Sequence, residues 1–121
     1  MLNLTPHAIK ILNADGDTTV VSPSGRVAKV TMAERIDHTV HLVAGSVGVP
    51  AITRTPDDVE GIQEDDFENH PDGVIVSSMV LDNLPPSLRQ YNIYAPDTGA
   101  SAIRNEKGQV DAVTRLVTPK I

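Results

Sequence analysis

The chain has 121 residues, a hydrophobic content of 40%, an aromatic content of 2% and no cysteine. We predict one β-rich domain, residues 1–121. This length allows a single core, and the low aromatic content means that aliphatic side chains build most of it. The lack of cysteine excludes a disulfide framework and a thiolate metal site. The formal net charge of −6 makes duplex nucleic acid a poor partner, because duplex binding depends on a basic face that neutralises phosphates.

The acidity belongs to one segment, since seven of the 16 acidic residues lie between positions 57 and 68. A small anionic ligand held by a few arginines therefore stays compatible with the net charge. No apolar run is long enough to span a membrane, and no secretion signal is recognisable, so we expect the cytoplasm and no membrane partner. The thin aliphatic core favours a homo-oligomer, which would bury further surface.

The first predicted element is a strand from Leu2 to Leu12, and Asp15-Gly16 predicts a hairpin turn to a return strand at Thr18 to Ser22. A turn at Pro23-Ser24-Gly25 follows. Further short strands are predicted at residues 26–32, 39–43 and 47–53.

The acidic segment from Thr55 to Gly73 reads as a solvated loop with one turn of helix, held to the body by Phe67. The apolar run Val74-Ile75-Val76 predicts a central, fully buried strand. Ser77 and Ser78 are N-cap candidates for a short helix that ends before two prolines, Pro85 and Pro86. The remaining predictions are strands at residues 91–95, 102–104 and 110–117, with a hairpin turn at 107–108.

Together these elements predict a mostly β, or α+β, fold: a single small antiparallel β domain with one or two short helices. No internal repeat, heptad pattern or low-complexity tract is present.

The sequence offers no convincing catalytic or metal site. His38 and His41 would point to opposite sides of a strand, and the acidic segment lacks the spacing of a calcium loop. No nucleophile elbow and no glycine-rich phosphate loop occurs. We therefore expect no catalytic residue, no metal and no cofactor, and a protein that is not an enzyme. His7, next to the rigid Pro6, is expected to make a structural hydrogen bond to a neighbouring carbonyl.

Arginines and tyrosines in the last third of the chain have the chemistry of a nucleotide pocket. A flat ring can stack on a base, an amide can read its edge, and guanidinium groups bind phosphates. The alternative is that the arginines pair with nearby acids at the surface, and composition does not decide between the two. The candidate ligand-binding residues are Arg89, Tyr91, Asn92, Tyr94, Arg104 and Arg115.

Several stretches in order along the chain resemble a family of small phage and prophage proteins with an Asn-Leu-Thr-Pro-His motif near the N-terminus. The stretches are Asn3 to Ile9, Pro23 to Ala28, Val59 to Ile62, Val74 to Val80, Arg89 to Asn92, Pro96-Asp97 and Ile103 to Gly108.

The chain is also similar to the phage anti-Thoeris proteins that act as nucleotide sponges. This resemblance implies a symmetric oligomer in the host cytoplasm that sequesters cyclic ADP-ribose or another cyclic nucleotide without altering it. Two features depart from the family: a longer, more acidic segment before Val74, and Tyr91 where an acidic residue is commoner. The alternatives are a virion structural protein, either a capsid decoration or a tail accessory, and a small hydrolase acting on nucleotides.

Overall fold

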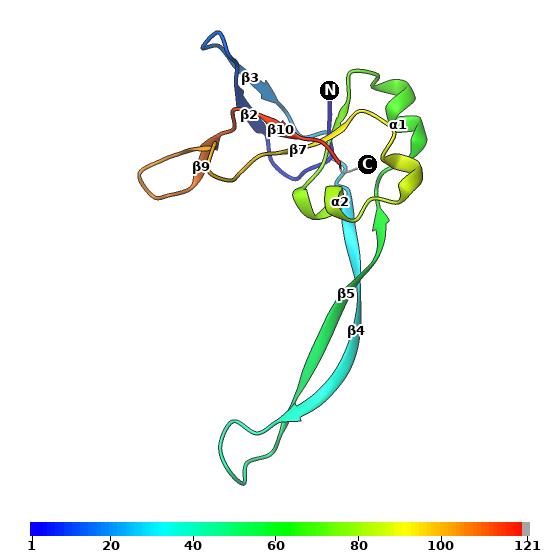
Figure 1. Ribbon diagram of the computed structural model, residues 1–121, viewed down its shortest axis with the longest axis vertical. Helices are drawn as coiled ribbons and strands as arrows, with labels where there is room; N and C mark the ends of the chain where they lie inside the picture. Colours follow the sequence, from blue (N-terminus) through cyan, green and yellow to red (C-terminus); the bar gives the residue numbers. More distant parts are fainter. Residues whose placement is uncertain (120–121) are drawn as a thin grey trace.

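The body of the protein is built on a four-stranded sheet in the order β1-β6-β7-β10. In the computed structural model, which describes residues 1–119, three β-hairpins project from this body (Figure 1). Strands make up 40% of the chain and helices 12%, which confirms the predicted mostly β fold with two short helices. The strands of the body sheet are β1 (Leu2–Asn3), β6 (Val74–Ile75), β7 (Ile93–Pro96) and β10 (Leu116–Val117).

The body sheet is mixed, while each hairpin is antiparallel. β6 lies between β1 and β7 and runs parallel to both, and β10 runs antiparallel to β7. The apolar run from Val74 to Val76 is fully buried, so the predicted central strand is confirmed. A short apolar run without polar alternation is what a strand with both faces covered requires.

Short helices cover the sheet and close the core. α2 (Ser78–Asp82) begins at Ser77, whose Oγ accepts a hydrogen bond from the backbone N–H of Val80, and it ends before the proline pair, as predicted. α1 (Glu64–Asn69) places Phe67 in the core, where its ring stacks on Tyr91 with 4.5 Å between centroids. Phe67 therefore holds the acidic segment to the body, as predicted. A 3-10 helix, η1 (Pro86–Leu88), follows α2.

Two of the hairpins are short. β2 (Ile9–Leu12) pairs with β3 (Thr18–Val21), and β8 (Ile103–Arg104) pairs with β9 (Val110–Ala112). Both predicted hairpin turns are confirmed: Gly16 and Gly108 take φ values of 92° and 78°, which glycine adopts without strain. The strand predicted from 110 to 117 is instead divided into β9 and β10, which belong to different sheets.

Asn3 explains why the strand predicted from Leu2 to Leu12 is broken. Its side chain is 1% exposed and its Nδ2 donates to the carbonyls of His7 at 2.9 Å and Val21 at 3.0 Å. Its Oδ1 accepts from the backbone N–H of Thr5 at 2.9 Å and from the Thr5 hydroxyl at 2.6 Å. These bonds bend the chain between β1 and β2. A hydrogen bond was expected from the His7 side chain, but in the structure it is the His7 backbone carbonyl that bonds, accepting from Nδ2 of Asn3 and from the Thr5 hydroxyl.

The third hairpin is a long arm that extends away from the body (Figure 1). β4 (Lys29–Val40) and β5 (Val49–Glu60) pair along their whole length, so the three short strands predicted within residues 26–53 are wrong in their boundaries. Pro50 and Pro56 are accommodated within β5 because each strand of a two-stranded arm has a free edge, where a proline leaves no ladder bond unmade.

The acidic segment contains the predicted turn of helix, which is α1, but its first residues belong to β5 and not to a solvated loop. Asp57 and Asp58 lie in β5, and the first turn of α1 is acidic, which suits the positive end of the helix dipole. Asp66 is buried, accepts a hydrogen bond from the Gln63 N–H at 2.8 Å and forms an ion pair with Arg26.

Replacement of Asn3 by alanine is expected to lower the free energy of unfolding by about 3 kcal/mol, because buried partners lose their hydrogen bonds. Asn13→Ala is the matched control: Asn13 makes one exposed hydrogen bond, to Thr19, and its loss is expected to cost less than about 0.5 kcal/mol. Urea unfolding of both variants measures the difference. Equal losses of unfolding free energy in the two variants would contradict a central role for Asn3.

Candidate functional site

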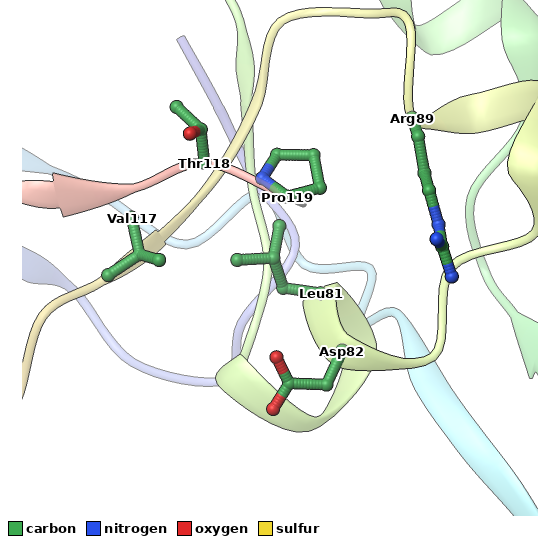
Figure 2. Close-up of a pocket in the computed structure, with 6 residues that line it drawn as sticks. All are labelled: Leu81, Asp82, Arg89, Val117, Thr118 and Pro119. Atoms are coloured by element: carbon green, nitrogen blue, oxygen red, sulfur yellow. The ribbon is translucent and has the colours of Figure 1, made fainter. Parts of the chain in front are cut away.

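A hollow in the body lies between α2, the segment after η1 and the chain that follows β10. Its volume is about 330 Å³ (Figure 2). The residues that line it are Leu81, Asp82, Arg89, Val117, Thr118 and Pro119. Leu81 and Val117 supply apolar walls, while Asp82 and Arg89 supply opposite charges. Sequence reasoning missed Asp82 and Thr118, because they come from segments whose proximity only the fold creates.

A second hollow, with a volume of about 270 Å³, shares Arg89, Thr118 and Pro119 with the first. The segment from Arg89 to Tyr94 forms the rest of its lining. The structure thus brings together four of the predicted residues, Arg89, Tyr91, Asn92 and Tyr94, beside one hollow. Each hollow is near the lower end of the roughly 300–1,000 Å³ that small-ligand sites occupy.

Arg89 lies where the two hollows meet. Its backbone N–H donates to the Pro86 carbonyl at 3.3 Å, which fixes the residue at the end of η1. Its Nε donates to the Leu84 carbonyl at 3.1 Å, and Figure 2 shows the side chain extended along one wall of the first hollow. Within residues 1–119 the guanidinium forms no ion pair, so its terminal nitrogens keep their capacity to bind an anion.

The neighbouring polar side chains differ in how freely they can meet a ligand. One face of the Tyr91 ring is covered by Phe67. Asn92 donates from Nδ2 to the Pro71 carbonyl at 3.2 Å. Tyr94 is half-buried in β7 and lines the second hollow. Tyr94 is therefore the better placed ring for a base.

The other two predicted arginines lie elsewhere and bind the protein itself. Arg104 donates to the backbone carbonyls of Gly108 at 2.9 Å and Thr98 at 2.8 Å, and so braces the β8–β9 hairpin. The Nε of Arg115 lies 2.5 Å from Oδ2 of Asp97, as the alternative of surface ion pairs predicted. Neither lines the two hollows around Arg89.

Asp97 is the ion-pair partner of Arg115. The hydrogen bond from Arg115 holds the pKa of Asp97 below its ordinary value, and the Gly99 backbone N–H and the Ser101 hydroxyl lower that pKa further. Arg115 makes this bond through Nε, as Arg89 does to Leu84, but the partner of Arg115 is a carboxylate, which neutralises the charge of the arginine and repels a phosphate.

The described part of the chain contains no cluster of three or more histidine or acidic side chains placed to hold a metal ion. None of the helices within residues 1–119 has the length and apolar character needed to cross a membrane. Comparison of the chain with protein-family models, curated proteins and solved structures finds no match.

Replacement of Arg115 by methionine is expected to raise the pKa of Asp97 towards its ordinary value of 3.8, as followed by NMR titration of the carboxyl carbon. Because the pKa of Asp97 is lowered in the folded state, the ionised carboxylate stabilises the fold at pH values above 3.8. This stabilisation is lost as the pH falls through the folded-state pKa. The difference in free energy of unfolding between the wild type and Arg115→Met should therefore decrease as the pH falls. Arg35→Met, on the arm, is the control and should leave the pKa of Asp97 unchanged. An unchanged pKa in Arg115→Met would contradict the assignment.

Proposed function

We propose that this chain is a phage-encoded, non-enzymatic binding protein that captures a small anionic nucleotide and withholds it from a host antiphage receptor. The nucleotide is of the cyclic ADP-ribose or cyclic oligonucleotide class, and the protein acts in the host cytoplasm as a homo-oligomer. The observation that carries the proposal is Arg89, a half-buried arginine oriented by the Leu84 carbonyl and set between two hollows.

The chemistry of the surrounding residues suits a nucleotide. The terminal nitrogens of Arg89 can form two parallel hydrogen bonds to one phosphate. Tyr94 offers an aromatic ring to a base, and the Asp82 carboxylate, in the adjoining hollow, can accept hydrogen bonds from ribose hydroxyls. The carboxylate also disfavours a second phosphate beside it, which orients the ligand with its phosphate at Arg89.

Binding without turnover is supported by the lining residues. Among the described residues around both hollows there is no histidine, cysteine or serine, and the single acid, Asp82, has no partner acid for paired acid–base catalysis. The resemblance to nucleotide sponges, which is drawn from the sequence alone, supports the same mechanism.

Isothermal titration calorimetry with cyclic ADP-ribose isomers and cyclic dinucleotides tests this function. We expect heat of binding with at least one of them and recovery of the ligand intact by chromatography. Arg89→Met should weaken binding at least 10-fold, because a charged hydrogen bond contributes about 1.5–3 kcal/mol. The control is Arg35→Met, which removes an arginine from the arm. Absence of heat across the panel, turnover of the ligand, or equal affinities of the two variants would contradict the proposal.

A second candidate, a virion structural protein, is favoured by the long exposed arm. Arms of this kind suit attachment to a larger assembly, because an isolated two-stranded ribbon is only marginally stable in water. Mass spectrometry of purified phage particles separates the two functions: a capsid decoration or tail accessory protein is expected at many copies per particle, and a nucleotide sponge is expected to be absent.

A further inference from the structure

The arm has one apolar and one polar face. Side chains alternate between the faces of a strand, and paired residues share a face. The pairs of the apolar face, taken outwards from the body, are Val30–Val59, Met32–Pro56, Glu34–Arg54 and Ile36–Ile52. The pairs of the polar face include Lys29–Glu60, Thr31–Asp58 and Arg35–Thr53. Bulges at Asp57 and Asp37 shift the register beside these pairs. Between Met32–Pro56 and Ile36–Ile52 the apolar face is interrupted by one row of opposite charges.

The apolar face begins at the core and continues uncovered. Val30 and Val59 pack against the core, whereas Ile36 is 69% exposed and Ile52 is 43% exposed. Figure 1 shows the outer half of the arm extending beyond the body, with no other element of the described chain beside it. A ribbon of this length with a bare apolar face requires a covering partner to be stable.

The tip of the arm is apolar as well. The loop between β4 and β5 contains Leu42, Val43 and Val47, and Val47 is 93% exposed. The row of opposite charges on the apolar face, Glu34–Arg54, indicates what kind of surface can cover the arm. The Nε of Arg54 lies 2.9 Å from Oε1 of Glu34, and both side chains are exposed.

We propose that the apolar face binds the same face of a second copy of this chain, with the two arms parallel and a two-fold axis running along them. This axis exchanges the strands, so that β4 of each copy lies over β5 of the other. Each Glu34 then faces the Arg54 of the second copy, and each Ile36 faces an Ile52. Two-fold interfaces are self-complementary in this way, and packed sheets lie about 10 Å apart, with side chains filling the gap.

The charges and the tip favour this arrangement over an antiparallel one. Antiparallel stacking about the same row would place Glu34 over a second Glu34, and like charges at close range repel. It would also separate the two tips, whereas parallel arms bring their exposed apolar loops together. This dimer does not depend on the nucleotide proposed above, because the residues of the arm do not line the hollows around Arg89.

Sedimentation of charge-reversed variants tests the dimer. Glu34→Arg and Arg54→Glu, each alone, place like charges face to face and should sediment at the monomer mass of 12.9 kDa. An equimolar mixture should recover the wild-type mass, because the arginine introduced at position 34 of one chain meets the glutamate introduced at position 54 of the other. The repulsion within each chain persists in the mixture, so recovery reports contact between chains. Arg35→Glu, on the polar face, is the control and should retain the wild-type mass.

Thiol cross-linking tests the parallel geometry, because the native chain contains no cysteine. A mixture of Ile36→Cys and Ile52→Cys chains, treated with a short bismaleimide that spans the gap between packed sheets, should form a cross-linked dimer, and a mixture of Arg35→Cys and Thr53→Cys chains should not. A monomeric wild type, variants that stay associated when alone, a mixture that fails to recover the wild-type mass, or equal cross-linking of both mixtures would overturn the proposal.

Discussion

The buried amide of Asn3 is the interaction on which the rest of the structure depends. Its buried side chain ties β1 to the turn at Thr5 and His7 and to the end of β3. The backbone around it extends the connection, because the Asn3 carbonyl accepts from the Ser24 N–H and the Leu4 carbonyl accepts from the Ala28 N–H. Ala28 directly precedes β4. A few N-terminal residues thus fix the edge of the body sheet, the first hairpin and the base of the arm, and a buried amide left without these partners would destabilise all of them together.

The distribution of aliphatic side chains is the second constraint. With few aromatic rings the core is limited to residues such as Leu4, Ile75 and Ile93, which fill the space between the body sheet and the short helices. Other large aliphatic residues, Ile36 and Val47 among them, lie on the arm and its tip instead. Placing apolar area outside the core of a small domain lowers the stability of the monomer but provides a surface that association can bury. The expectation of a homo-oligomer from composition and the proposed pairing of the arms have this common physical basis.

Local signals in the sequence predicted the elements that local chemistry determines. The buried run from Val74, the Ser77 cap and the turn at Gly16 depend on neighbouring residues, and each is confirmed. The arm was missed because no strand was assigned to residues 33–38 and the acidic segment from Thr55 was interpreted as a loop. The alternation of Val30, Met32 and Ile36 with polar residues was nevertheless present. The acidic segment was misread because its net charge masked the pairing of Asp66 with Arg26, which only the tertiary fold creates.

The candidate site also depends on contacts that only the tertiary fold creates, because three arginines of identical chemistry have three different environments. Arg104 is bound at both terminal nitrogens by backbone carbonyls, and Arg115 is paired through Nε with a carboxylate. Arg89 is held through Nε by a neutral carbonyl, which does not neutralise its charge. Spacing along the chain could not separate them, because their partners come from turns that bring other segments close. The fold also links this site to the arm: α2 contacts β4 and contributes Leu81 and Asp82 to one hollow. A ligand at Arg89 would therefore lie close to the base of the arm, and paired arms would hold two such sites in one molecule.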